Sequence, residues 1–299
     1  MLASRAGRLP AGRLTVLQVA YAGSMGALMD QGIRPMVARS LGIDLQGQGQ
    51  GAFALAHLIV AGSIRPDIFI SITPGPMNVL LAAGRVKRAI PVARTEMVLA
   101  YSRDGRCASR FESRPLKEPW WRILEDPRVR FGRTDPRTDP QGLNIIFLME
   151  LAQRYYHAPG LATRILGPLE NPRQIFPEAE VMARLQSGQL DASSAYKTQP
   201  SSFGLPFLSL PSEINLGDAR MERRYREVSA VIGGVVHRPQ ALVFYAALLR
   251  DAPAPAVARR FMEWLAGPQA ASAFARYHYD PPGDATPLVP SHEGPDSVK

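Results

Sequence analysis

The sequence predicts an α/β protein of two lobes, and three observations support this class. Apolar runs with strand character alternate with runs whose apolar residues recur at helical spacing, which is typical of a parallel sheet covered by helices. A length of 299 residues exceeds what one hydrophobic core usually organises, so two cores are expected. The alternation breaks near Ile90–Pro91 and then resumes, which indicates a passage from one lobe to the other.

The first lobe is expected to begin with an apolar run that ends at Gly23 and is followed by apolar residues at helix spacing. This pattern predicts a strand, a tight turn and a helix. The remaining signals predict, in order, a strand at 43–45, a glycine-rich turn at 47–51, a helix over 52–61, a buried strand at 67–71 and a helix over 77–83.

The second half of the chain is also predicted to alternate strands and helices. Its expected elements are strands at 95–101 and 129–132, a helix over 143–156, a helix over 178–187, strands at 191–196, 206–210 and 228–236, and helices over 241–249, 256–266 and 268–277. The chain is expected to cross between lobes near 90–95 and again near 225–230. Lobe I then comprises 13–93 and 229–282, lobe II comprises 94–228, and 1–12 and 283–299 are expected to be flexible tails.

Composition excludes several classes of protein. With 46% hydrophobic and 20% charged residues, the chain can bury sizeable cores, which excludes global disorder. The single cysteine, Cys107, excludes an internal disulfide and a cysteine-based metal site. The five histidines share no metal-ligand spacing, and no apolar run is long enough for a membrane span. The net charge of +9 permits anionic ligands, but no basic run is interleaved with aromatic residues, so no nucleic-acid partner is expected.

Two short motifs suggest chemistry. The turn Ala22-Gly-Ser24-Met-Gly26 is close to a nucleophile elbow, and His237 or His278 could complete a hydrolase triad. Alternatively, Ser24 caps the following helix, or it helps to bind an anion at the N-terminus of that helix. The run 47–52, Gly-Gln-Gly-Gln-Gly-Ala, fits the spacing of a dinucleotide-binding loop, but the strand before it is short, which favours an ordinary turn.

Two further segments carry polar residues in unusual settings. Asp139 directly precedes Pro140 at an expected helix start, where its carboxylate can cap the helix. Tyr196 ends a buried strand, and an extended segment rich in proline follows it up to Glu213 and beyond. The positions of proline, glycine and polar residues in these segments are more specific than is typical of an ordinary loop.

At these positions the chain resembles the extracellular solute-binding proteins of molybdate/tungstate ABC transporters, especially the tungstate-binding WtpA-like branch. The resemblance covers about residues 14–282. The segments that carry it are Ala22-Gly-Ser24, Gly51-Ala-Phe-Ala-Leu-Ala56, Pro66-Asp-Ile-Phe-Ile-Ser71, Phe131-Gly-Arg-Thr-Asp-Pro136 with Asp139-Pro-Gln-Gly142, Tyr196-Lys197 and Leu210-Pro-Ser-Glu-Ile-Asn-Leu216.

The resemblance implies a type II periplasmic-binding-protein fold, with two α/β lobes that are joined by two crossover strands and close over a tetrahedral oxyanion. It also implies a ligand-binding set of Ser24, Gly51, Ala52, Asp139, Tyr196 and Glu213. Of these, Asp139 and Glu213 match the carboxylates that approach the metal centre of the bound oxyanion. One departure is Ala52, which stands where the family commonly has an anion-binding serine, so a hydroxyl donor is lost.

The expected function is therefore a receptor that binds tungstate or molybdate, catalyses nothing, needs no cofactor and delivers its ligand to an ABC permease and its ATPase subunit. A monomer is expected, in the periplasm or outside the cell. The first thirteen residues lack the apolar segment of a secretory signal, however, which leaves a cytoplasmic oxyanion or small-ligand sensing module as the alternative. A serine hydrolase that uses Ser24 is a third reading.

Overall fold

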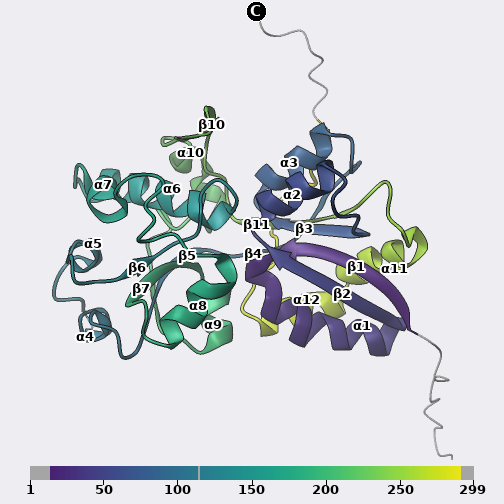
Figure 1. Ribbon diagram of the computed structural model, residues 1–299, viewed down its shortest axis with the longest axis horizontal. Coiled ribbons are helices and arrows are strands. Elements are labelled where there is room, and N and C mark those ends of the chain that lie inside the picture. Colours follow the sequence, from purple (N-terminus) through teal and green to yellow (C-terminus); the bar gives the residue numbers. More distant parts are fainter. Residues whose placement is uncertain (1–13, 114, 291–299) are drawn as a thin grey trace, which may run out of the picture.

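The computed structural model describes residues 14–113 and 115–290 and contains two α/β lobes arranged side by side (Figure 1). The sheet of lobe I has the order β2-β1-β3-β11-β4, and the sheet of lobe II has the order β6-β7-β5-β8. The predicted fold class is thus confirmed. None of the helices formed by the described residues combines the length and apolar character that crossing a membrane requires.

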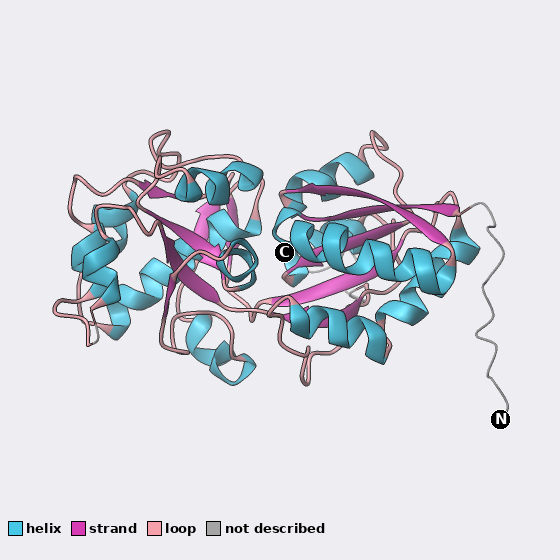
Figure 2. Ribbon diagram, turned by 90° about the horizontal axis from the view of Figure 1, so that it is seen from below, coloured by secondary structure: helices cyan, strands magenta, loops and turns pink. Residues whose placement is uncertain are grey.

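Lobe I is a mixed sheet. Strand β1 pairs in parallel with β2 and β3, whereas β11 runs antiparallel to both β3 and β4. The strands are β1 (Thr15–Ala22), β2 (Ile43–Gln50), β3 (Ile68–Ile72), β4 (Ile90–Arg94) and β11 (Val243–Leu248), and the helical elements are η1 (Gly23–Met25), η2 (Leu28–Ile33), α1 (Arg34–Leu41), α2 (Ala52–Val60), α3 (Pro74–Ala82), α11 (Pro255–Leu265) and α12 (Pro268–Arg276). Helices α2 and α3 cover one face of the sheet, and α1, α11 and α12 cover the other (Figures 1 and 2).

Lobe II is built around β5, which is antiparallel to both β7 and β8, while β6 pairs in parallel with β7. Its strands are β5 (Met97–Tyr101), β6 (Phe131–Gly132), β7 (Ala192–Tyr196) and β8 (Phe207–Ser209). Its helices are α4 (Ala108–Glu112), α5 (Trp120–Leu124), α6 (Pro140–Tyr155), α7 (Leu161–Leu166), α8 (Glu178–Gln186) and α9 (Thr198–Phe203). The segment after β8 contains η3 (Ala219–Met221), α10 (Glu222–Tyr225), β9 (Ala230–Ile232) and β10 (Val235–His237).

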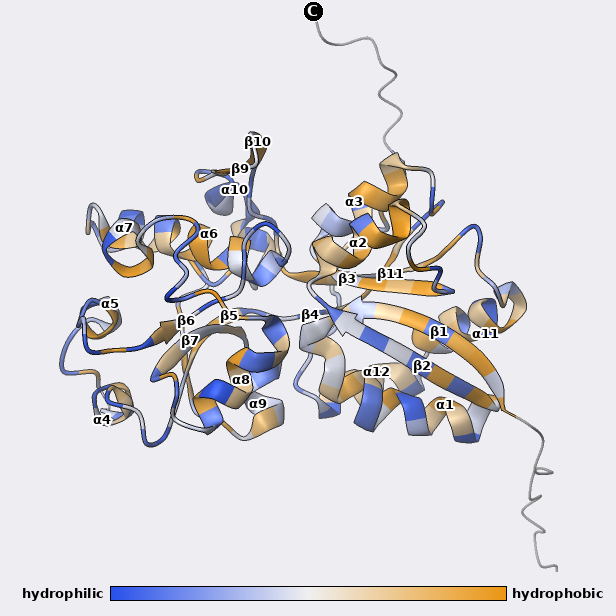
Figure 3. Ribbon diagram, in the orientation of Figure 1, coloured by the Kyte–Doolittle hydropathy of each residue, from blue (hydrophilic) through white to orange (hydrophobic). Residues whose placement is uncertain are grey.

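The segment 241–249, predicted as a helix, instead contains the buried strand β11, which lies between β3 and β4 in the lobe I sheet. A short, fully apolar run satisfies either structure, and only the pairing with β3 and β4 decides between them. Hydropathy colouring shows β11 and β3 as adjoining apolar strands (Figure 3). The predicted long strand at 228–236 is also wrong: Gly233 and Gly234 turn the chain, with positive φ at both, into the short hairpin β9–β10.

Strand β2 is longer than predicted, because the glycine-rich segment expected as a turn continues the strand through Gln50. Gly47 and Gly49 lie under the ring of Tyr21, and a Cβ atom on either would come within 2.6 and 2.8 Å of that ring. These glycines therefore make room for an aromatic side chain. They do not form a phosphate-binding loop, since the turn that such a loop needs is absent from this part of the described chain.

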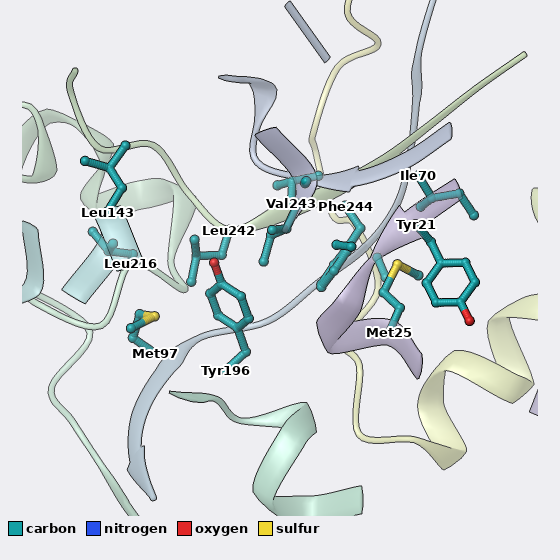
Figure 4. Packing of buried hydrophobic residues seen from close by; sticks show 14 of the residues in the cluster. Tyr21, Met25, Ile70, Met97, Leu143, Tyr196, Leu216, Leu242, Val243 and Phe244 are labelled. Carbon is teal, nitrogen blue, oxygen red and sulfur yellow. The ribbon is translucent and has the colours of Figure 1, made fainter. Parts of the chain in front are cut away.

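The lobes are joined where Thr95 donates its N–H to the carbonyl of Leu242, and Leu242 donates to the carbonyl of Leu216. The second crossover thus lies near Leu242, about fifteen residues later than predicted, since the hairpin before it packs on α6 of lobe II. Figure 4 shows Leu216, Leu242 and Met97 near Tyr196, with Phe244 and Met25 of lobe I beyond them. Apolar packing is thus continuous through the hinge.

The C-terminal segment also departs from the prediction. Asp280 and Arg94 exchange backbone hydrogen bonds, and Leu288 exchanges a second pair with Ala89. Residues 283–290 are therefore held against lobe I up to at least Leu288 and are not a flexible tail. The predicted tail at 1–12 and residues 291–299 lie outside the described residues.

Candidate functional site

A cavity of about 740 Å³ lies between the two lobes. Lobe I supplies the ends of β1 and β2 and the start of α2, and lobe II supplies the loop 134–139 and the segment 175–179. Its lining consists of Tyr21, Gly23, Gly26, Asp30, Gly47, Gly49, Gln50, Gly51, Ala54, Thr134, Asp135, Thr138, Asp139, Ile175, Phe176, Pro177, Glu178 and Ala179. This lining includes four carboxylates and no lysine, arginine or histidine. We refer to it below as the interlobe cleft.

Asp139 lies at the N-cap of α6, as predicted. Its Oδ1 accepts the N–H of Gln141 at 2.9 Å, and Pro140 occupies the first helical position, where no N–H is needed. The side chain is 4% exposed, and its other oxygen, Oδ2, has no hydrogen-bond partner. Burial raises the pKa of Asp139 to about 6. One carboxylate oxygen is thus fixed by the helix, and the other is available at the cleft.

Glu178 is the second carboxylate of the site. It opens α8 and reaches across the lobe boundary to Gly23, where a Cβ atom would collide with its carboxylate. The residue is half-buried as a whole, yet its Oε2 is buried and has no hydrogen-bond partner. Burial raises the pKa of Glu178 well above its usual range, and the charge of Asp139 adds to this shift, while the N–H groups of Ser24 and Gly23 oppose it.

Hydroxyl groups surround the two carboxylates. Ser24, in the turn η1, and Thr134, five residues before Asp139, are both buried; the Ser24 hydroxyl has no hydrogen-bond partner, whereas Thr134 acts on the Asp139 carboxylate and opposes the rise of its pKa. Ser24 lies in a smaller cavity of about 280 Å³, which shares Gly23 and Glu178 with the interlobe cleft. The Ser24 hydroxyl is therefore free to bond a polar group at the lobe boundary.

Tyr196 completes the group. It is fully buried at the end of β7, and its hydroxyl accepts the amide of Asn144 at 3.1 Å, which leaves the O–H proton free to donate. Burial raises the pKa of Tyr196 well above its usual range, and the charges of Asp139 and Glu178 raise it further. The phenol therefore stays neutral, with its O–H proton available for donation near both carboxylates.

The backbones of the two lobes also meet at Gly51. The N–H of Ala54 in α2 donates to the carbonyl of Thr138 in lobe II at 3.2 Å, and a Cβ atom on Gly51 would lie 2.7 Å from that same carbonyl oxygen. Elements α8 and α9 of lobe II also contact η1 of lobe I. The structure is therefore a closed arrangement in which backbone meets backbone.

Of the predicted set, Gly51 and Asp139 line the interlobe cleft, Ser24 lines the adjoining smaller cavity, and Tyr196 is buried where the charges of Asp139 and Glu178 act on it. Ala52 is buried beside Gly51 at the first position of α2. Glu213 is not among the residues that line the interlobe cleft; its carboxylate accepts from Ser212 at 3.3 Å, and its charge acts on Tyr156 and Tyr225 instead. Glu178, which the sequence did not single out, lines the interlobe cleft, and the charge of Asp139 acts on it. In the sequence Glu178 stands out only as an acidic residue after a proline at a helix start, and nothing local shows that it faces Gly23.

The raised pKa of Asp139 predicts how stability depends on pH. The folded state binds this proton more tightly than the unfolded chain does, so the contribution to stability present near pH 4 is lost as pH rises through about 6. Asp139→Asn removes this dependence, and at pH 7.5 it should stabilise the ligand-free protein by on the order of 1–3 kcal/mol. Thermal unfolding at pH 4.5 and 7.5 measures the difference.

Asp104→Asn is the control for this experiment, because Asp104 is an exposed aspartate of the same lobe. It should change the melting temperature little at either pH. Equal melting temperatures of Asp139→Asn and the parent protein at pH 7.5 would show that burial does not strain this carboxylate.

Known proteins with similar sequences identify the family of this two-lobe protein. Residues 17–280 match the family model described as bacterial extracellular solute-binding protein. The molybdate/tungstate-binding protein WtpA of Thermococcus kodakarensis is 29% identical over 209 residues, 63% of this chain and 58% of that protein. The protein of the same name from Pyrococcus abyssi is 28% identical over 228 residues, 69% of this chain and 65% of that protein. The aligned part of the chain therefore spans about three fifths of the length of these two relatives.

Among solved structures, the periplasmic molybdate-binding protein of Azotobacter vinelandii superimposes with a TM-score of 0.60 at 16% identity and covers 88% of this chain and 98% of that one. At this identity the likeness shows a shared fold of two lobes. The family match, in contrast, covers most of the chain and includes both lobes and both crossovers. The chain belongs to the bacterial extracellular solute-binding proteins, a family of ligand-binding proteins that are not enzymes.

Proposed function

We propose that this protein captures tungstate or molybdate between its lobes and delivers it to an ABC permease and its ATPase subunit. The observation that carries the proposal is the pair Asp139 and Glu178, each with a buried oxygen that lacks a hydrogen-bond partner at the lobe boundary. The names of the two WtpA relatives support the same ligand class.

Two carboxylates next to a bare anion repel it, so a cleft with four carboxylates and no cationic side chain is a poor site for an ordinary anion. A tetrahedral oxometalate differs because its metal centre can accept further oxygen ligands. Asp139 Oδ2 and Glu178 Oε2 would bind the metal of the ligand, while the hydroxyls of Ser24, Thr134 and Tyr196 donate to its oxygens.

Lobe closure would couple these contacts. Ser24 and Gly51 belong to lobe I, whereas Asp139, Glu178 and Tyr196 belong to lobe II. A ligand that contacts both sets gains its full interaction free energy only when the lobes are closed, so binding shifts the population toward the closed state. The permease would then recognise the closed form.

Calorimetric titration of ligand-stripped protein with tungstate, molybdate and sulfate tests the proposal. Tungstate and molybdate should bind at least about 100-fold more tightly than sulfate, because sulfur does not expand its coordination to the two carboxylates. Sulfate binding of equal strength would contradict metal coordination, and the absence of heat with all three anions would contradict the whole proposal.

Two alternative functions are a sensing module of the same fold and a serine hydrolase. A sensing module of the same fold would bind the same anions, so only its location in the cell would distinguish it from a transport receptor. The family is described as extracellular, which favours an exported receptor. A serine hydrolase needs a base beside Ser24, and no histidine lines the smaller cavity that contains Ser24 or the adjoining interlobe cleft. The geometry therefore favours binding over catalysis.

A further inference from the structure

Tyr279 follows α12 in lobe I and is buried, although its side chain ends in a hydroxyl group. Its ring packs against Phe244 of β11 and Phe274 of α12, with ring centroids 5.1 and 5.4 Å away. Its hydroxyl donates to the carbonyl oxygen of Ser24 at 3.3 Å. A buried aromatic side chain thus bonds to η1, the turn that contains Ser24, from within lobe I.

The backbone around Tyr279 is held on both sides. Helix α12 ends in a Schellman motif, in which the N–H of His278 donates to the carbonyl of Ala275 and the N–H of Tyr279 donates to that of Phe274. His278 has φ of 66° at the position of this motif that glycine usually occupies. The next residue, Asp280, exchanges backbone hydrogen bonds with Arg94. The main chain therefore fixes where the ring of Tyr279 starts, in spite of the uncommon conformation of His278.

The hydroxyl of Tyr279 also meets lobe II. Thr198 is the first residue of α9 and is buried, and α9 contacts η1. Burial raises the pKa of Tyr279 well above its usual range, and the Thr198 hydroxyl acts on the phenol in the opposite direction. The charge of Glu178 adds to the rise. The phenol is therefore neutral and keeps the proton that it donates to Ser24.

The contact with Tyr279 restrains the backbone of Ser24. The N–H groups of Gly23 and Ser24 act on the Glu178 carboxylate, whereas the Ser24 carbonyl accepts the hydroxyl of Tyr279. Tyr279 lines neither the interlobe cleft nor the smaller cavity, so this carbonyl oxygen is engaged outside both. Donor groups that are fixed before a ligand arrives do not have to reorganise when it binds. Holding the carbonyl thus keeps the donors of the turn in place.

We propose that Tyr279 is a positioning residue for the turn η1: its phenol holds the Ser24 carbonyl within lobe I and links it to Thr198 of lobe II. The turn is then ordered for a ligand when the lobes are closed. This role rests on the proposed function, because it requires that Ser24 donates to the bound oxyanion.

Tyr279→Phe tests the role, since it removes the hydroxyl and keeps the aromatic packing. The melting temperature of the ligand-free protein should fall by no more than about 3 °C. Calorimetric titration should show tungstate binding about tenfold weaker than in the parent protein. Tyr277→Phe is the matched control, because Tyr277 lies two residues earlier with its ring against Gly32. It should bind tungstate within about twofold of the parent protein.

Amide hydrogen exchange of the ligand-free protein measures the order of the turn without tungstate. The N–H groups of residues 24–26 should exchange about tenfold faster in Tyr279→Phe, while those of β11 keep the parent rate. Thr198→Val removes the hydroxyl on the lobe II side and should have a similar effect. Because the two hydroxyls act on one contact, the double variant should change little beyond either single variant.

Parent-like exchange at residues 24–26 in Tyr279→Phe, parent-like tungstate affinity in the same variant, or fully additive effects of the two substitutions would overturn the proposal. The proposed function fails separately. If the parent protein does not bind tungstate, that function is wrong, and hydrogen exchange in the two single variants still decides whether Tyr279 orders the turn.

Discussion

Tungstate binding should collapse when both cleft carboxylates are made neutral. Each interaction of a charged group with a buried partner contributes about 1.5–3 kcal/mol, so Asp139→Asn and Glu178→Gln should each weaken tungstate binding by about 10- to 100-fold. The two residues act on one metal centre, so the double variant should lose less than the product of the two effects. Calorimetric titration of the two single variants and the double variant gives these numbers.

The chain offers a matched control. Glu213→Gln removes a glutamate that the resemblance assigns to the site but that does not line the interlobe cleft. It should leave tungstate affinity within about threefold of the parent value. The reverse result, with Glu213→Gln damaging and Glu178→Gln neutral, would return the second carboxylate to its sequence-based assignment.

The carboxylate variants should also separate function from stability. The pKa of Asp139 and that of Glu178 are both raised by burial, so neutral replacements should stabilise the empty protein near neutral pH while they weaken ligand binding. A residue that is retained for packing shows the opposite pattern, in which stability and binding fall together. A more stable protein that binds tungstate less tightly is therefore the expected signature of a binding carboxylate.

Gly51→Ala should prevent closure of the lobes. Its backbone has φ of −53°, which alanine adopts without strain, so the variant should fold normally. In the closed state, however, the new Cβ atom would lie 2.7 Å from the carbonyl oxygen of Thr138, and a backbone atom cannot yield as a flexible side chain can. Tungstate affinity should fall by about 100-fold, because the ligand can reach only one lobe at a time.

Small-angle scattering provides the direct measurement. The parent protein should become more compact when tungstate is added, whereas Gly51→Ala should keep the radius of gyration of its ligand-free form. Gly26→Ala is the control, since Gly26 also lines the interlobe cleft but a Cβ atom there meets nothing within 4 Å. Full closure and parent-like affinity in Gly51→Ala would show that the approach at Thr138 does not limit closure.

Local sequence signals were reliable where they concern single elements. The capping of α6 by Asp139 follows from an Asp-Pro pair before an apolar run, and the structure confirms it. The first strand, its turn at Gly23 and the helix of Glu178 also follow from local patterns. These features depend on residues within one or two turns of each other, which is why periodicity and capping residues identify them.

The sequence patterns failed where the deciding partner is distant in the chain. The run at 241–249 is apolar throughout, so its strand structure depends on β3 and β4, which lie about 150 residues earlier or more. Gly47 and Gly49 suggest a turn until the ring of Tyr21 is placed on them. The hairpin β9–β10 replaces a single strand because two glycines with positive φ interrupt its pattern.

The sequence by itself therefore determined the two-lobe α/β class, the elements of both lobes that rest on short-range patterns, and Asp139 as a carboxylate at a helix start. Only the tertiary structure decided which carboxylate faces Asp139. Glu178 comes to Gly23 because α8 of lobe II packs against η1 of lobe I, and the sequence separation of these two residues carries no local signal.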